Sequence, residues 1–302
     1  SNVLAGEMFD VPVLGTHAHS WIMSFPDEYT AFKTYAELYP NACTLLVDTY
    51  DTLKSGVPNA IRVFSELRDK GIHPKSYGIR IDSGDLAYLS IEARRMLDEA
   101  GFEDASISAS NDLDEYLIES LKAQGAKINV WGVGTNLITS KDNPSFGGVY
   151  KLAAIMDEEG NFVPKIKKSE NIEKVTNPGN KKVYRIYDND TGKIKADLIC
   201  LADQVYDVSE ELTLFDPNAP WKKITLPGGS YTMRALLVPV VKAGKTVYQS
   251  PSVMEIRDYC NKEKHTIWDS CKRFKFAQLP RVDLSKKLYD LKVELLHDAG
   301  EE

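Results

Sequence analysis

The feature that most constrains the fold is an alternation of short apolar runs with helical segments over the first half of the chain. The runs that resemble strands are 11–14, 44–47, 77–81, 105–109, 128–131 and 149–155. Between them, segments 57–70, 90–100 and 112–124 carry apolar residues at helical spacing, and each is followed at once by a glycine. Parallel strands need such crossover helices, and the unit recurs roughly every 25–30 residues. The pattern predicts an α/β fold, either a βα barrel or an open parallel sheet.

The pattern changes after about residue 155. Segment 157–182 is polar and lysine-rich, which predicts a loop, and 181–201 alternates around a turn at 188–192, which predicts a β-hairpin. A second hairpin is expected over 232–248, and helices over 253–264 and 283–296. We therefore expect a βα-barrel segment with the active-site loops over 1–155, and a mixed region of β-hairpins and helices over 156–302.

Composition narrows the class of protein. The chain has 302 residues, of which 43% are hydrophobic, enough to bury a full core. A net charge of −7 argues against a nucleic-acid or polybasic membrane surface, although local basic pockets for phosphate stay possible. The four cysteines form no CxxC pair, and there is neither a signal peptide nor an apolar run of membrane-spanning length. These features predict a soluble cytoplasmic protein with free thiols.

Small, polar or acidic residues follow the expected strands. The loops are Gly15-Thr16-His17-Ala18-His19-Ser20, Asp48-Thr49-Tyr50-Asp51-Thr52, Asp82-Ser83-Gly84-Asp85, Ser110-Asn111-Asp112 and Gly132-Val133-Gly134-Thr135-Asn136. The carboxyl ends of parallel strands lie on one face, and in a barrel that face holds the active site. The polar chemistry of this chain is therefore expected there.

The pair His17 and His19 raises three alternatives: a metal site, one catalytic histidine, or a structural pair. A metal site needs further ligands from later strand ends. The other histidines are His73, which precedes a strand, and His265 and His297 in the tail. The metallohydrolase reading is therefore disfavoured.

Other loops are compatible with a phosphorylated sugar. A glycine-rich turn at 132–136 exposes backbone N–H groups that can hold phosphate, although a simple tight turn has the same sequence. Arg80 and Asp82 lie on one face of a strand, where they either bind a substrate or pair with each other. Asp82 and Asp85 could accept hydrogen bonds from sugar hydroxyls or hold Mg²⁺ through water. Asp48 and Asp51 add carboxylates at the same strand ends, or only cap helices.

Together these loops resemble the nicotinate phosphoribosyltransferase family. The matching motifs, in order, are Gly15-Thr16-x-Ala18-His19-Ser20, 46–52, Arg80-x-Asp82-Ser83-Gly84-Asp85-Leu86, Ser110-Asn111-Asp112, Gly132-Val133-Gly134-Thr135 and 147–152. The resemblance implies an α/β barrel of the type II phosphoribosyltransferase kind. It also implies transfer of a phosphoribosyl group from 5-phosphoribosyl 1-pyrophosphate to nicotinate, with ATP as co-substrate and Mg²⁺ as cofactor.

The resemblance also implies residue roles. His19 would be phosphorylated by ATP, Asp82 would hold the ribose hydroxyls as a catalytic residue, and Thr16 and Arg80 would contact nicotinate. Asp85, Asn111, Gly134 and Thr135 would complete substrate binding, the last two at the phosphate. His17 fills the variable position of its motif and inherits no role, and no residue is assigned to a metal.

The family carries a further N-terminal region and usually forms homodimers with shared active sites. This chain, which starts at Ser1, resembles the C-terminal three fifths of such an enzyme, so the isolated chain is expected to have little or no activity. The alternatives are a nicotinamide or quinolinate phosphoribosyltransferase and a non-catalytic piece that only binds ligand.

Overall fold

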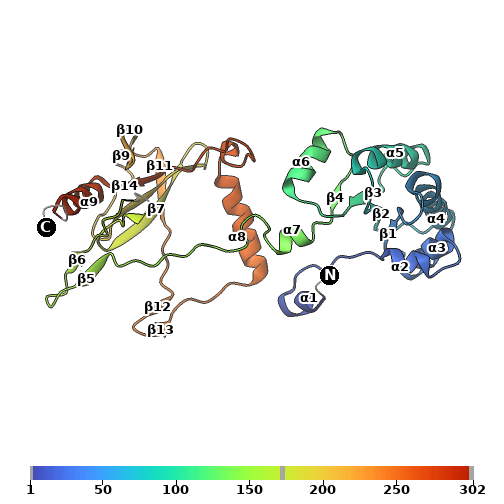
Figure 1. Cartoon of the computed structure of the whole chain (residues 1–302), viewed down its shortest axis with the longest axis horizontal. Coiled ribbons are helices and arrows are strands. Elements are labelled where there is room, and N and C mark those ends of the chain that lie inside the picture. The colour runs from blue at the N-terminus through green and yellow to red at the C-terminus, as the bar shows by residue number, and fades with distance from the viewer. Residues whose placement is uncertain (1–2, 171–173, 299–302) are drawn as a thin grey trace. The chain divides into compact units, whose positions relative to one another are not determined.

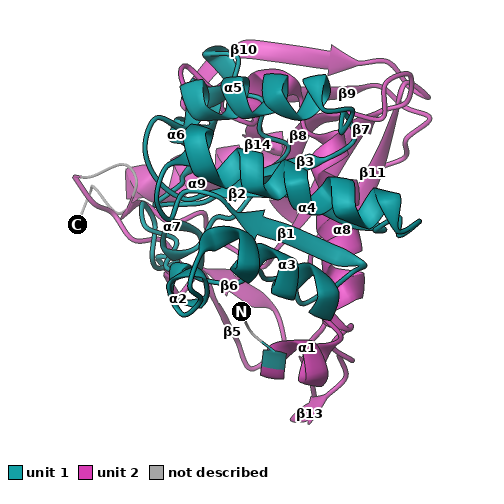
Figure 2. Cartoon of the chain, turned by 90° about the vertical axis from the view of Figure 1, so that its right-hand side faces the viewer, with its two compact units in different colours: residues 1–3, 12–147 teal, residues 4–11, 148–302 magenta. Residues whose placement is uncertain are grey.

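The computed structural model describes residues 3–170 and 174–298. Two parts of the expected regions lie outside that description: residues 1–2, at the start of the first region, and residues 171–173, in the expected loop. The chain divides into two compact units, one of residues 12–147 and one of residues 4–11 and 148–298, coloured separately in Figure 2. Whether the expected boundary near 155 separates two domains stays a prediction.

The first unit is a parallel sheet with helices between its strands. It contains β1 (Ala42–Leu46), β2 (Ser76–Ile81), β3 (Ser106–Ala109), β4 (Val130–Trp131), α2 (His19–Met23), α3 (Glu28–Leu38), α4 (Val57–Asp69), α5 (Leu86–Glu99), α6 (Glu115–Ala123), α7 (Thr135–Ile138) and a π-helical turn, Thr52–Gly56. The strand order is β1-β2-β3-β4, all parallel. Figure 1 shows α3, α4 and α5 along one side of the strands. Of these, α4 connects β1 to β2 and α5 connects β2 to β3. The expected α/β fold is confirmed for this unit.

The two faces of this sheet differ in chemistry. Ile79, Ile81 and Ile107 are fully buried and belong to the core that also contains α3, α4 and α5 residues. The alternate positions of β2 and β3 include Arg80 and Ser108, which are only partly buried. The period of two along each strand therefore separates an apolar face from a face with polar side chains.

Two expected strands are absent from the parallel sheet. Segment 11–14 has no regular structure, and Leu14 is 84% exposed. An apolar run becomes a strand only where a neighbour pairs with it, and no described residue pairs with this one. Of 149–155, only the end forms a strand, and that strand pairs antiparallel with a later one in the second unit.

The second unit is a mixed β/α arrangement, as expected. It contains most of α1 (Val3–Phe9), β5 (Ala154–Met156), β6 (Phe162–Pro164), β7 (Lys181–Asp188), β8 (Ile194–Leu201), β9 (Leu212–Asp216), β10 (Ala219–Leu226), β11 (Tyr231–Ala235), β12 (Val241–Lys242), β13 (Lys245–Thr246), α8 (Val253–Thr266), a 3₁₀ turn at Asp269–Cys271, β14 (Val282–Leu284) and α9 (Lys286–Asp298). Its main sheet has the order β11-β7-β8-β14, in which only the β8–β14 pair is parallel. The hairpin predicted over 181–201 is confirmed as β7 and β8. No helix among the described residues is long and apolar enough to cross a membrane.

Candidate active site

The polar loops at the carboxyl ends of β1, β2 and β3 meet around Asp48. The side chain of Asp48 is 2% exposed, and both of its oxygens are engaged. Oδ1 lies 3.1 Å from Nε2 of His19. Oδ2 accepts the backbone N–H of Asp82 at 3.0 Å and the hydroxyl of Ser83. One buried carboxylate therefore joins the first histidine loop to the loop after β2.

Arg80 organises the neighbouring half of the cluster. Its Nη1 donates to Thr16 Oγ1 at 2.8 Å, its Nε donates to Ser110 Oγ at 2.8 Å, and its Nη2 donates to Asp82 Oδ1 at 2.9 Å. Ser110 also donates to Asp82 Oδ1. A guanidinium has five N–H donors in a planar fork, so these three contacts leave two for a ligand. Both alternatives for Arg80 and Asp82 are thus compatible with the structure, because the ion pair exists and the arginine keeps spare donors.

Asp82 is held in its ionised form by its neighbours. Burial raises the pKa of its carboxyl group, but the hydrogen bonds from Ser110 and Arg80 outweigh burial, and the net pKa lies below the usual aspartate value. In the described part of the chain, Asp82 Oδ2 has no hydrogen-bond partner. This oxygen is the one that a sugar hydroxyl can approach.

The two histidines have different surroundings. His17 is 8% exposed, and its Nε2 accepts the backbone N–H of Leu46 at 3.3 Å. Its ring packs edge-on against Tyr35, with centroids 4.5 Å apart. Burial is the main cause that lowers the pKa of His17 to about 4. His19 instead leaves 38% of its side chain exposed and points Nε2 at a carboxylate.

These contacts give the two rings opposite tautomers. A carboxylate only accepts hydrogen bonds, so Nε2 of His19 carries the proton and Nδ1 keeps the lone pair. A backbone N–H only donates, so Nε2 of neutral His17 carries the lone pair and Nδ1 the proton. His17 is thus a buried acceptor of a backbone N–H, whereas His19 is a partly exposed partner of a carboxylate.

The remaining predicted residues lie at the same strand ends but are less engaged. Asp85 caps α5 by accepting the N–H of Tyr88 at 3.0 Å. Asn111 has a positive φ of 91° and an exposed side chain. Gly134 precedes the four-residue helix α7, and Thr135 is its first residue. Their roles in substrate binding stay predictions.

Sequence reasoning treated Asp48 as one of several rim carboxylates and gave Ser110 no role of its own. Their roles depend on contacts between distant positions of the chain. Asp48 contacts a residue 29 positions away, and Ser110 contacts residues 28 and 30 positions away. The one available signal was that each directly follows a strand whose neighbour also ends in a polar loop. Among the described residues, no group of three or more His, Cys, Asp or Glu side chains is arranged to hold a metal ion.

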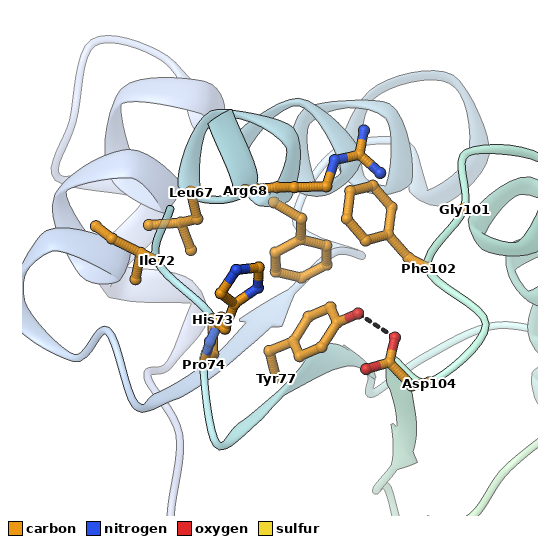
Figure 3. Close-up of a pocket in the computed structure, with 10 residues that line it drawn as sticks. Leu67, Arg68, Ile72, His73, Pro74, Tyr77, Gly101, Phe102 and Asp104 are labelled. Atoms are coloured by element: carbon orange, nitrogen blue, oxygen red, sulfur yellow. Dashed lines mark hydrogen bonds between the residues drawn. The ribbon is translucent and has the colours of Figure 1, made fainter. Parts of the chain in front are cut away.

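The opposite end of the strands carries a different feature. A cavity of about 220 Å³ is lined by aromatic residues from α4, β2 and the loop before β3. Figure 3 shows Tyr77, whose hydroxyl contacts Asp104, beside Phe102 and His73. Arg68 lies over the Phe102 ring, 4.7 Å from its centroid. This cavity is remote from His19, at the face where barrels keep structural rather than catalytic residues.

Known proteins of one family are similar to this chain. Residues 180–292 match the family model of the nicotinate phosphoribosyltransferase C-terminal domain. The chain is 47% identical over 300 residues to nicotinate phosphoribosyltransferase of Bacillus subtilis, which covers 99% of this chain and 59% of the relative. It is 34% identical to the enzyme of that name from Dictyostelium discoideum, over 96% of this chain and 56% of the relative.

Among solved structures, human nicotinic acid phosphoribosyltransferase matches with a TM-score of 0.71 and 26% identity, over 97% of this chain and 64% of that chain. Nicotinate-nucleotide pyrophosphorylase from Pyrococcus furiosus, 22% identical with a TM-score of 0.58, shares the fold. The fold and these similarities relate the chain to the α/β phosphoribosyltransferases. Within that class, the chain is similar over nearly its whole length to nicotinate phosphoribosyltransferases. It spans about three fifths of the length of the curated relatives it matches.

Proposed function

We propose that this chain carries the phosphohistidine and pyridine-binding part of a nicotinate phosphoribosyltransferase. The enzyme would join nicotinate to 5-phosphoribosyl 1-pyrophosphate, release pyrophosphate and nicotinate mononucleotide, and couple this reaction to ATP hydrolysis. The observation that carries the proposal is the His19–Asp48 pair beside the Arg80–Asp82–Ser110 cluster. The 47% identity to a relative of that name supports it.

His19 is the proposed phosphoryl acceptor. The lone pair on Nδ1 attacks the γ-phosphorus of ATP, a nitrogen–phosphorus bond forms, and the bond to the β,γ-bridging oxygen breaks with its electrons leaving on ADP. The carboxylate of Asp48 stabilises the positive charge that develops on the ring, since it already accepts the proton on Nε2. Water later attacks the phosphohistidine and releases phosphate.

The sugar and the pyridine would bind beside this histidine. Displacement of pyrophosphate at the anomeric carbon passes through a cation-like sugar, which the carboxylate of Asp82 stabilises. The spare N–H donors of Arg80 suit the planar carboxylate of nicotinate, and Thr16 lies against the same guanidinium. The pyridine nitrogen forms the new bond to carbon as the bond to the pyrophosphate oxygen breaks.

Mg²⁺ fits this site only as a partner of the substrate. Asp82 is the one carboxylate of the cluster with an unengaged oxygen, because Asp48 uses both of its own. Octahedral Mg²⁺ commonly takes one or two protein carboxylates and fills its other positions from phosphates and water. When bound, it would neutralise the charge of the leaving pyrophosphate.

The parallel strands are proposed to be part of a barrel. Their order follows the chain without a switch of direction, which is the arrangement of βα barrels and differs from doubly wound sheets. Asp85, Asn111, Gly134 and Thr135 would line the substrate at this end. The proposal also includes that the full enzyme is a homodimer and acts in the cytoplasm.

Incubation with ATP followed by mass spectrometry of the peptides tests the histidine. We expect one phosphate on His19. His19→Gln should abolish it, because the glutamine amide keeps the contact with Asp48 but has no nucleophilic nitrogen. The matched control His73→Gln, at the far end of the strands, should leave it intact. A phosphate on His17, or none on the wild-type chain, would contradict the assignment.

Turnover is a separate question. Formation of nicotinate mononucleotide, measured with nicotinate, nicotinamide and quinolinate in competition, identifies the pyridine substrate. We expect nicotinate to be preferred, and the isolated chain to work far more slowly than a full-length relative. Binding of 5-phosphoribosyl 1-pyrophosphate without any product would instead favour the ligand-binding alternative.

A further inference from the structure

The position of Asp48 depends on the segment that follows it. Asp48 lies just after β1, and only three residues separate it from the π-helical turn Thr52–Gly56. The turn is closed by Asp51, whose carbonyl accepts the N–H of Gly56 at 2.9 Å and whose side chain accepts the N–H of Lys54 at 2.9 Å. With so short a connection, a shift of the turn is passed directly to Asp48.

Gly56 presses the end of this turn against β1. A Cβ placed on Gly56 would lie 1.9 Å from the carbonyl oxygen of Val47 and 2.7 Å from its carbonyl carbon. Both atoms are backbone, so no side chain can swing away. The dihedrals of Gly56 are ordinary helical values, φ −59° and ψ −59°. Glycine is therefore required here for space and not for its conformational freedom.

A buried carboxylate holds the same turn from the other side. Glu28, the first residue of α3, is 4% exposed. Its Oε2 accepts the hydroxyl of Ser55 and the Nδ2–H of Asn59 at 3.0 Å. Asn59 also donates to Ser55 Oγ at 3.3 Å. The turn is thus fixed between β1 and α3 by one backbone contact and one hydrogen-bonded carboxylate.

Burying Glu28 in this way lowers the stability of the fold. Among the described residues, Oε1 of Glu28 is buried without a hydrogen-bond partner. A buried polar atom without a partner lowers stability, and a charged one lowers it further, whereas an apolar side chain of similar size avoids that cost. Stability alone therefore does not account for a glutamate at this position.

We propose that Gly56 and Glu28 are positioning residues that hold the π-helical turn, and through it Asp48, where Asp48 can orient His19. The inference rests on the proposed function, in which His19 is the phosphoryl acceptor and its orientation therefore matters. Neither residue touches substrate in this proposal. Both act on Asp48 through Val47 and Ser55.

The backbone N–H of Asp82 reports the position of Asp48 without any substrate, because it donates to Asp48 Oδ2. In Gly56→Ala the backbones at Gly56 and Val47 would have to separate by about 1.5 Å for the new Cβ to reach an ordinary contact near 3.4 Å from the Val47 carbonyl oxygen. We expect hydrogen–deuterium exchange at the Asp82 amide, followed by NMR, to become about tenfold faster. Asp48→Ala gives the value for complete loss of the acceptor.

Two controls separate this effect from general loosening. The first is the amide of Ser110, which bonds to the Ile81 carbonyl at 3.1 Å in the same sheet and should keep its exchange rate. The second is Gly147→Ala, a matched substitution in open space, which should change neither amide. Equal acceleration at Ser110 and Asp82 in Gly56→Ala would contradict the proposal.

Ser55→Ala provides a milder variant in case Gly56→Ala does not fold. It removes the hydroxyl donor to Glu28 without adding volume, and we expect exchange at Asp82 to accelerate about threefold. Wild-type exchange at Asp82 in every folded variant would overturn the proposal. Because no ATP or pyridine is used, this result is independent of whether His19 becomes phosphorylated. A chain that is phosphorylated normally in both variants would also refute the positioning role and leave the proposed function standing.

Discussion

The low pKa of buried His17 predicts that the first unit loses stability in a pH range above that in which carboxylates with lowered pKa values are protonated. Burial lowers its pKa from 6.5 to about 4, so below pH 6.5 the unfolded chain binds a proton that the folded chain refuses. Stability from this residue is complete above about pH 6.5 and is lost as the pH falls towards 4. At 1.36 kcal/mol per pKa unit, the free energy of unfolding should fall by about 2.5 kcal/mol between pH 7 and pH 4.5.

The measurement is urea unfolding followed by tryptophan fluorescence in a Trp221→Phe, Trp268→Phe background, so that Trp21 and Trp131 of the first unit give the signal. His17→Gln is the test variant, because its amide oxygen still accepts the N–H of Leu46 but does not titrate. Its free energy of unfolding should stay nearly flat over this range. Parallel pH curves for wild type and His17→Gln would refute the reasoning, whatever their absolute stabilities.

Two further predictions concern the site and the second unit. Asp48→Asn should lower the rate of ATP-dependent phosphorylation of His19 about a hundredfold, because a neutral amide cannot stabilise the positive charge on the ring and its single oxygen cannot accept from both His19 Nε2 and the Asp82 N–H. Mass spectrometry measures the rate, with Asp104→Asn as control, and an unchanged rate would exclude Asp48 from the mechanism. Ser252→Ala should destabilise α8 by about 1 kcal/mol, since Ser252 and Glu255 form a reciprocal capping box. Faster amide exchange at Glu255 would report this loss, and unchanged exchange would mean that the cap contributes nothing.

Local pattern was sufficient for β1 to β4 and for α4 to α6, because each is an apolar period ended by glycine or a polar loop. It was insufficient for segment 11–14, whose composition suits a strand but which has no described neighbour to pair with. It also misplaced the start of α6: the expected segment begins at residue 112, whereas the helix begins at Glu115 and is capped by Asp114, whose side chain accepts the N–H of Leu117 at 2.7 Å. Asn111 and Asp112 have positive φ values, so the chain there turns before the helix begins.

The candidate site was predictable as a place but not as a network. The period of two put Arg80 and Asp82 on one face, and the structure pairs them. The His19–Asp48 contact, by contrast, joins two loops that are far apart in the sequence, and no short-range sequence pattern predicts that they meet. Glu28 and Gly56 are less predictable still: their environment is made by α3, the π-helical turn and β1 together. Sequence pattern locates the strand ends, whereas packing decides which polar groups meet there.

The two histidines explain how one short loop serves both the fold and the chemistry. In the parallel pair β1–β2, the N–H of Val47 bonds to Arg80 at 3.0 Å, so the N–H of Leu46 points to the opposite edge of β1. His17 Nε2 accepts that N–H and anchors the loop to the sheet. His19, two residues further along the chain, contacts Asp48, which lies just after β1. Because both contacts lie at the end of β1, His17 and the proposed phosphoryl acceptor His19 keep a fixed position relative to each other. His17 acts there as a buried neutral acceptor, and His19 as a donor to a carboxylate.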